Sequence, residues 1–116
     1  MGIRDNFKKG SVEMLLLTLL REEDMYGYQL SQEIKERSEG IITIPEGSMY
    51  PTLYRLEQNG YVTSCKKTVG SRLSRIYYHI EEKGIERLQT MWSEYHVFND
   101  ALLKVRSISD SVIEKN

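Results

Sequence analysis

The sequence has little of what builds disulfides, metal centres or catalytic sites. Cys65 is the only cysteine among 116 residues, which excludes an internal disulfide framework and a multi-cysteine metal site. We interpret it as a half-buried strand residue. The two histidines, His79 and His96, fall on different predicted elements, and no glycine-rich phosphate loop or nucleophile elbow occurs. The sequence therefore predicts neither an enzyme nor a bound cofactor.

Long apolar runs are also missing. No segment approaches the roughly 18 apolar residues that a membrane span needs. The start, residues 1 to 6, has neither an apolar core nor a small-residue cleavage site. Hydrophobic residues make up 40% of the chain and charged residues 28%, as is typical of a soluble globular protein. We therefore expect one domain with an appendage, no membrane partner and a cytoplasmic location.

A net excess of either charge is absent too, because the formal net charge is −1. The basic residues are nevertheless unevenly placed. No acidic residue lies between Gln58 and Ile80, whereas four basic residues do: Lys66, Lys67, Arg72 and Arg75. Clustered cations attract phosphate groups, so this segment is a candidate phosphate contact. The alternative is that these charges are solvated and keep a hairpin edge from aggregating.

Two helices are predicted in the first part of the chain. Apolar spacing indicates one from about Ser11 to Arg21, with Ser11 as its N-cap. A second begins near Tyr26, has apolar residues every four positions and stops at Gly40. The β-branched stretch Ile41–Ile44 is then expected to be a short edge strand.

A third helix is predicted over residues 47 to 60. Its inward residues are Met49, Leu53 and Leu56, and its outward residues are Thr52, Arg55, Gln58 and Asn59. Pro51 pushes Tyr50 towards extended geometry, but Ser48 is the better capping side chain. We therefore expect Ser48 to cap the helix and Pro51 to lie in its first turn, where its missing N–H costs nothing.

Two strand-like stretches follow, at residues 61 to 67 and 75 to 80, and a turn at 69 to 71 joins them into a β-hairpin. From Glu81 to about Arg106 the pattern is helical again, some 25 residues or about 38 Å long. The coiled-coil seam of this helix contains Ile85, Leu88, Trp92, Tyr95, Asn99 and Leu102. We expect these residues to join two chains as a homodimer, with Asn99 fixing the register, and the tail after Ser107 to fray.

This order of elements indicates a mainly α (α+β) fold. We assign residues 1–80 to a winged helix-turn-helix domain and 81–116 to a dimerisation helix with a frayed tail. In such a fold the third helix enters the major groove of double-stranded DNA, and the hairpin, or wing, contacts the backbone. The candidate DNA contacts are Ser48, Tyr50, Thr52 and Arg55 on the helix, and Lys66, Lys67, Arg72 and Arg75 on the wing. The alternatives are that Arg55 is an ordinary surface residue, and that the chain is a winged-helix protein-interaction module that does not bind DNA.

Four motifs resemble the signature segments of the PadR family of bacterial and archaeal transcriptional repressors. They are Tyr-Gly-Tyr-Gln-Leu at 26–30, Gly-Ser-Met-Tyr-Pro at 47–51, Leu-Tyr-Arg-Leu-Glu-Gln-Asn-Gly at 53–60 and Arg-Ile-Tyr-Tyr at 75–78. The resemblance implies a dimeric repressor that binds a near-palindromic operator and releases it when a small molecule binds. The short C-terminal region resembles that of the smaller subfamily, which has a single terminal helix and includes multidrug-responsive regulators. The chain departs from the family pattern at Glu81, where Thr is frequent, and in the loop 70–74.

In that subfamily a tryptophan on the last helix faces its twin across the dimer and lines an apolar drug-binding pore. Trp92 lies at the matching position, and the resemblance implies that Val12, Leu16 and His96 are its neighbours in a ligand site. A flat aromatic or amphipathic ligand would stack on two such indoles. From the residues alone, Trp92 is explained equally by packing between protomers. A third reading of the chain is a dimer that sequesters drugs without acting on DNA.

Overall fold

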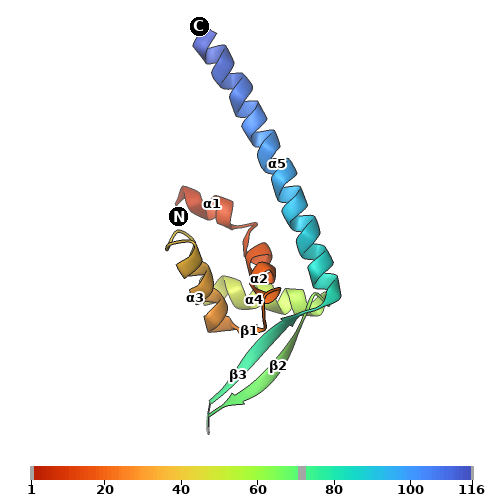
Figure 1. Ribbon diagram of the computed structural model, residues 1–116. Coiled ribbons are helices and arrows are strands. Elements are labelled where there is room, and N and C mark those ends of the chain that lie inside the picture. Colours follow the sequence, from red (N-terminus) through yellow and green to blue (C-terminus); the bar gives the residue numbers. More distant parts are fainter. Residues whose placement is uncertain (1, 71–72, 116) are drawn as a thin grey trace.

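The computed structural model describes residues 2–70 and 73–115 of the chain. In chain order the elements are α1 (Ile3–Lys8), α2 (Val12–Leu20), β1 (Met25–Tyr26), α3 (Gly27–Arg37), α4 (Glu46–Gln58), β2 (Val62–Val69), β3 (Leu73–Ile80) and α5 (Glu82–Lys115). The β2–β3 hairpin projects from one end of the helical body and α5 from the other (Figure 1), and the longest dimension is 70 Å. The fold is mainly α with a small antiparallel sheet, as the sequence predicted.

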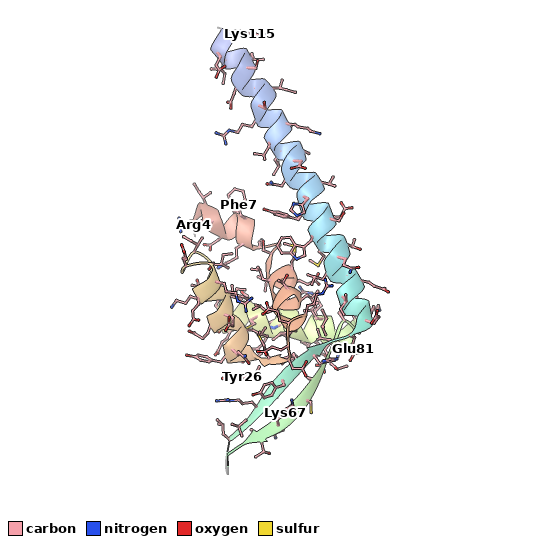
Figure 2. All side chains as sticks on the ribbon, in the orientation of Figure 1. Arg4, Phe7, Tyr26, Lys67, Glu81 and Lys115 are labelled. Atoms are coloured by element: carbon pink, nitrogen blue, oxygen red, sulfur yellow. The ribbon has the colours of Figure 1, made fainter. Side chains whose placement is uncertain are left out.

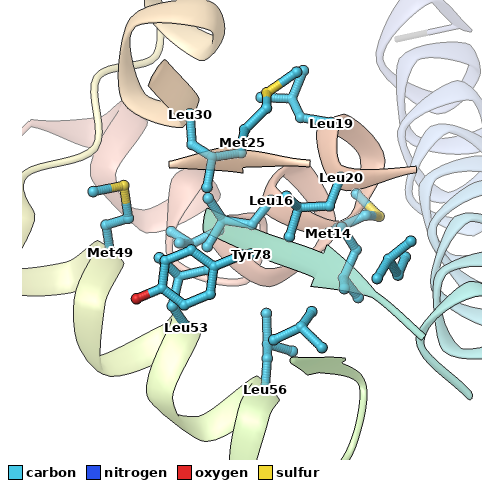
Figure 3. Close-up of a cluster of buried hydrophobic side chains, with 14 of the residues drawn as sticks. Met14, Leu16, Leu19, Leu20, Met25, Leu30, Met49, Leu53, Leu56 and Tyr78 are labelled. Atoms are coloured by element: carbon cyan, nitrogen blue, oxygen red, sulfur yellow. The ribbon is translucent and has the colours of Figure 1, made fainter. Parts of the chain in front are cut away.

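The hydrophobic core lies around α2, which is enclosed by α3, α4, the sheet and the start of α5 (Figure 3). Three leucines of α2, Leu16, Leu17 and Leu20, are 0 to 2% exposed. They meet Leu53 of α4 and Leu30 of α3 in one cluster. Full burial of one such side chain contributes about 1.5–3 kcal/mol, so this cluster holds α3 and α4 against α2.

The third strand of the sheet is not the one that the sequence predicted. The sheet order is β1-β3-β2, and Met25 and Tyr26 pair with Tyr78 and Tyr77. Residues 41–44 form no strand. Two of their backbone groups instead pair with side chains: the Ile42 N–H donates to the Ser38 hydroxyl at 3.0 Å, and the Thr43 carbonyl accepts from the Lys8 ammonium at 2.9 Å. The edge strand expected at 41–44 is therefore wrong, and the third strand of the sheet is β1.

Helix α4 begins two residues earlier than the predicted cap. Pro45 stands at the N-cap position, and its carbonyl accepts from the N–H groups of Ser48 and Met49, both at 3.0 Å. Ser48 is consequently inside the first turn and does not cap the helix. Pro51 lies in the second turn, where it removes one intrahelical hydrogen bond. The prediction failed because Pro45 already has the extended geometry from which a helix starts.

Helices α1 and α2 meet at Ser11. Helix α1 was not predicted from the sequence. Ser11 stands at the N-cap position of α2 as expected, but its hydroxyl does not cap that helix. It donates instead to the Phe7 carbonyl of α1 at 3.2 Å. The side chain therefore joins the two helices.

The hairpin is longer and more exposed than predicted. Of the eight residues of β2, only Val62 is buried. Cys65 is exposed, so the expectation of a half-buried thiol is wrong.

Helix α5 also exceeds its predicted length. It continues to Lys115, so the tail after Ser107 is helical rather than frayed. An Arg106–Asp110 ion pair at 3.7 Å and apolar residues at helical spacing continue the pattern. Figure 2 shows that side chains of the last turns near Lys115 have no other element beside them. In the part of the chain that the structure describes, no helix is both long and apolar enough to span a membrane.

Candidate nucleic-acid interface

The outer face of α4 presents most, but not all, of the predicted side chains. Met49, Leu53 and Leu56 are buried as expected. Thr52 is buried too, at 6% exposure, and its hydroxyl donates to the Ser48 carbonyl at 2.8 Å. The prediction that Thr52 faces outwards is therefore wrong, because the apolar stripe of α4 is wider than its three largest residues. A base contact from Thr52 loses its geometric support.

Ser48, Tyr50 and Arg55 are exposed on α4, as predicted. Tyr54 is 65% exposed and Gln58 is exposed beside it. Neither was among the predicted contacts. Helical periodicity places both opposite the buried residues of α4. The spacing of those buried residues in the sequence could therefore have identified Tyr54 and Gln58 as candidate contacts.

The two flanks of α4 face different neighbours. On the hairpin side, the Glu57 carboxylate accepts from the Ser64 hydroxyl of β2 at 2.6 Å. On the opposite side, Ser48 and Arg55 line a hollow of about 900 Å³, in the size range of small-molecule sites, which also touches α1, α2 and Arg87 of α5. Helix α4 is thus braced against the wing on one side and open on the other.

The wing places two of its cations on one sheet face. Lys67 and Arg75 are opposite each other in the β2–β3 ladder, whereas Lys66 faces Ile76 on the other side of the sheet. The Lys67 ammonium lies 4.7 Å from the centroid of the Tyr77 ring, and the Arg75 guanidinium carbon lies 4.3 Å from that of Tyr26. These rings hold both cations by cation–π contacts. Arg72 lies outside the described residues.

Counter-charges are scarce around these groups. Within the described ranges, no carboxylate lies within 4.0 Å of the charged atoms of Arg55, Lys66, Lys67 or Arg75. Burial raises the pKa of the Tyr78 phenol, and the nearby Tyr50 and Glu57 add to this shift. The phenol is therefore neutral at physiological pH and does not offset the positive charge of the wing.

A second group of predicted residues gathers at Trp92, where α5 passes α2. The indole N–H donates to the Thr18 hydroxyl at 3.1 Å, and that hydroxyl donates to the Met14 carbonyl at 2.7 Å. The Trp92 ring centroid is 5.7 Å from that of Tyr95 and 6.3 Å from that of His96. The hydrogen bond that the indole donates to Thr18 orients the Trp92 ring, and nothing in the sequence pattern signalled it.

The other two predicted ligand-contacting residues behave differently from Trp92 and His96. Leu16 is 0% exposed within the core. Its expected place in a pocket wall is therefore wrong for the protomer, because α3, α4 and the sheet enclose the inner side of α2. Val12 is 9% exposed and borders the hollow beside α4.

The predicted seam of α5 divides into two parts. Leu88 is 3% exposed and Ile85 packs against the core, so both belong to the protomer's own interior rather than to a free seam. Tyr95, Asn99 and Leu102 instead line an apolar groove of about 750 Å³ between α1 and α5, in the size range of ligand-sized hollows. The exposed apolar residues of α5 begin in this groove, which Phe98 and Leu102 line, and continue beyond it: Val97, Phe98, Leu102, Leu103, Val105, Ile108, Val112 and Ile113. No described residue covers this distal stripe.

Comparisons with known proteins agree on one family. A model described as "Transcriptional regulator PadR-like family" matches residues 16–90. A transcriptional regulator from Clostridium thermocellum has 30% identity and a TM-score of 0.80, covering 85% of this chain and 96% of that one. A PadR family transcriptional regulator from Eggerthella lenta has 31% identity and a TM-score of 0.78, covering 86% and 85%. Bacillus subtilis PadR in complex with operator DNA shares the fold, with 24% identity and a TM-score of 0.64 over 69% of this chain and 46% of that one.

Proposed function

The chain belongs to the PadR-like family of transcriptional regulators, and we propose that it is a homodimeric repressor that binds a near-palindromic operator. The family consists of regulators and not enzymes, in agreement with the sequence. Binding of a small aromatic or amphipathic ligand releases the operator in this proposal. The site of action is the cytoplasm, where the DNA is.

The observation that carries the proposal is the exposure of polar and aromatic side chains on α4 together with ring-supported cations on the wing. Helix α4 exposes Tyr50, Tyr54 and Arg55, and the wing carries exposed Lys67 and half-buried Arg75, each held on an aromatic ring. Side chains on an exposed helix reach base edges in the major groove, and cations beside it neutralise phosphates. The same fold is bound to operator DNA in the Bacillus subtilis relative, which supports this role for α4 and the wing.

A second copy of the chain is the proposed occupant of the α1–α5 groove and of the distal stripe of α5. Within the stripe, Phe98, Leu102 and Val105 lie four and three residues apart, and Val112 follows seven residues later, which is the spacing of a coiled-coil seam. The distal apolar side of this 34-residue helix is uncovered, and pairing with a second copy would remove it from water, which is favourable. Pairing places two α4 helices roughly 34 Å apart, one turn of DNA, as a palindrome requires.

The ligand in this proposal binds between the two copies at Trp92. The indole stands at the junction of α5 with α2, and α2 packs against α4. A ligand that stacks on Trp92 displaces α5 relative to α2 and so changes the spacing of the two α4 helices. The coupling required is about 1–3 kcal/mol, as in other allosteric proteins.

Charge reversal on the wing tests DNA binding. Lys66→Glu with Lys67→Glu should abolish retardation of the operator, whereas Lys35→Glu with Lys104→Glu changes the net charge equally and should leave it intact. If each of two protomers neutralises about four phosphates, the wild-type log–log slope of affinity against salt is about −7. Operator binding unaffected by the wing reversal would favour the protein-interaction module.

Substitution of Trp92 tests the ligand response. Rhodamine 6G, a planar aromatic cation, should quench the wild-type tryptophan fluorescence and release the operator. Trp92→Ala should remain a folded dimer that binds the operator but no longer responds to rhodamine 6G. An undiminished response in this variant would remove Trp92 from the mechanism, and quenching without release in the wild type would favour drug sequestration.

A further inference from the structure

A groove lies between the start of α3, the first half of α4 and the open edge of β3. Strand β3 pairs with β1 only at Tyr77 and Tyr78, and the groove runs along the part of β3 that precedes them. Its volume is about 540 Å³, ample for a phosphate group and its water. Four tyrosines and one arginine dominate its walls, and we name it the tyrosine groove: Tyr26, Tyr28, Tyr50, Tyr78 and Arg75.

We propose that the tyrosine groove binds one phosphate of the operator backbone in each protomer. The Arg75 guanidinium supplies the positive charge, and the hydroxyls of Tyr28 and Tyr50 donate hydrogen bonds to the phosphate oxygens. This assigns a DNA contact to Tyr28 and moves Tyr50 from the bases to the backbone. The inference rests on the proposed function, because it requires α4 in the major groove.

Arg75 is held ready for such a contact. Its guanidinium carbon lies 4.3 Å from the Tyr26 centroid, and Tyr26 meets Tyr77 edge-to-face at 5.4 Å. In the described part of the chain, no carboxylate pairs with Arg75 or lines the groove. A guanidinium stacked on a ring keeps its N–H donors directed outwards, in the geometry that suits phosphate oxygens.

Gly27 is what allows Tyr50 to reach this groove. A Cβ atom at Gly27 would lie 2.7 Å from the Tyr50 Cζ atom, so any larger residue would displace the ring. The phenol end of Tyr50 therefore rests on the first turn of α3, next to Tyr28. Tyr50 is 43% exposed and Tyr28 is 62% exposed, so solvent or a ligand has access to these side chains.

The position of the groove favours a backbone phosphate over a free anion. It lies between α4 and the wing, so a DNA strand that borders a major groove filled by α4 has to pass it. The walls are open rather than enclosing, which suits one group of a long polymer. Phosphate contacts of this kind fix the register of the protein on the duplex without reading sequence.

The test combines Tyr28→Phe and Arg75→Gln in a double-mutant cycle on the full-length protein. Loss of the Tyr28 hydroxyl should weaken operator binding about 100-fold or more per dimer, because a hydrogen bond to a charged acceptor, a factor of about ten or more, is removed twice. The salt slope should stay the same, since the hydroxyl is neutral. Arg75→Gln should flatten the slope by about 1.8, from 0.9 per phosphate in each of two protomers. In the Arg75→Gln background, Tyr28→Phe should cost less than twofold, because both groups hold the same phosphate.

Controls and contrary outcomes are distinct. Lys35→Gln, on the same helix as Tyr28 but two turns away, should leave both affinity and slope unchanged, and circular dichroism should show every variant folded. Wild-type affinity in Tyr28→Phe, or full additivity in the cycle, overturns the proposal while leaving the proposed function intact. Saturable binding of inorganic phosphate by the wild type, lost in Arg75→Gln without loss of DNA affinity, would assign the groove to a free anion instead. Absence of DNA binding in the wild type itself would overturn both proposals.

Discussion

Gly84→Ala tests how α5 packs against the winged helix-turn-helix domain. A Cβ atom at Gly84 would lie 2.8 Å from the Ile80 Cγ1 atom and 3.1 Å from the Tyr61 carbonyl carbon. The Tyr61 carbonyl is fixed, because it accepts from the Glu81 N–H at 2.9 Å. Overpacking of this kind costs about 1–3 kcal/mol, while alanine in a helix gains about 1 kcal/mol over glycine. The net loss in free energy of unfolding should therefore be about 0–2 kcal/mol, from the same two terms.

Gly47→Ala is the matched control, because Gly47 also lies in the first turn of a helix and a Cβ atom there meets nothing within 4 Å. Gly47→Ala should show only the gain in stability of about 1 kcal/mol that alanine has over glycine in a helix. The difference between the two variants then isolates the steric overlap at about 1–3 kcal/mol, or roughly 4 °C in melting temperature per kcal/mol. The assay is urea and thermal unfolding followed by circular dichroism at one protein concentration, since a dimer melts in a concentration-dependent way. Equal stability of the two variants would refute the close packing of α5 on Tyr61.

Three further outcomes are expected. Thr18→Val removes the acceptor of the Trp92 indole N–H. Operator affinity should persist, but the change in that affinity on adding rhodamine 6G should shrink severalfold. An unchanged response would show that this hydrogen bond does not transmit ligand binding. Arg37 lowers the pKa of Glu22 by hydrogen bonding, so the bond stabilises the fold above the ordinary value of 4.5 and is lost as pH falls through the folded value. Glu22→Gln should accordingly unfold earlier than wild type at pH 7 but equally in acid, and a gap that widens in acid would contradict this sign. Val105→Glu, on the distal stripe of α5, should shift sedimentation towards single protomers and weaken operator binding, whereas an intact dimer would exclude the stripe from the interface.

The elements in which apolar residues recur at a regular spacing were predictable from the sequence. Met49, Leu53 and Leu56 recur at helical spacing, and their burial follows directly from that spacing. The alternation in β3 likewise predicted the hairpin. Strand β1 carries no such signal, because two residues show no period and their partners, Tyr77 and Tyr78, lie far along the chain. The β-branched stretch at 41–44 looked more like a strand than the real one.

The candidate site shows the same division. The wing cations are visible as a basic segment in the sequence, but only the strand register shows that Lys67 and Arg75 share one face. Their aromatic supports depend on strand register, which the sequence leaves open. Seam spacing in α5 could not separate Leu88, buried within the protomer, from residues available to a second copy. An apolar heptad position has the same appearance whether its partner is the same chain or another.

A footprint of a selected operator tests the central claim most directly. DNA fragments that the purified protein selects from a random pool should share two inverted half-sites, and hydroxyl-radical cleavage should show two protected regions about 34 Å apart, one helical turn. Two protomers should be bound per fragment. Selection of no common sequence, or a single protected region with one protomer bound, would contradict a dimer that reads DNA with paired α4 helices and wings.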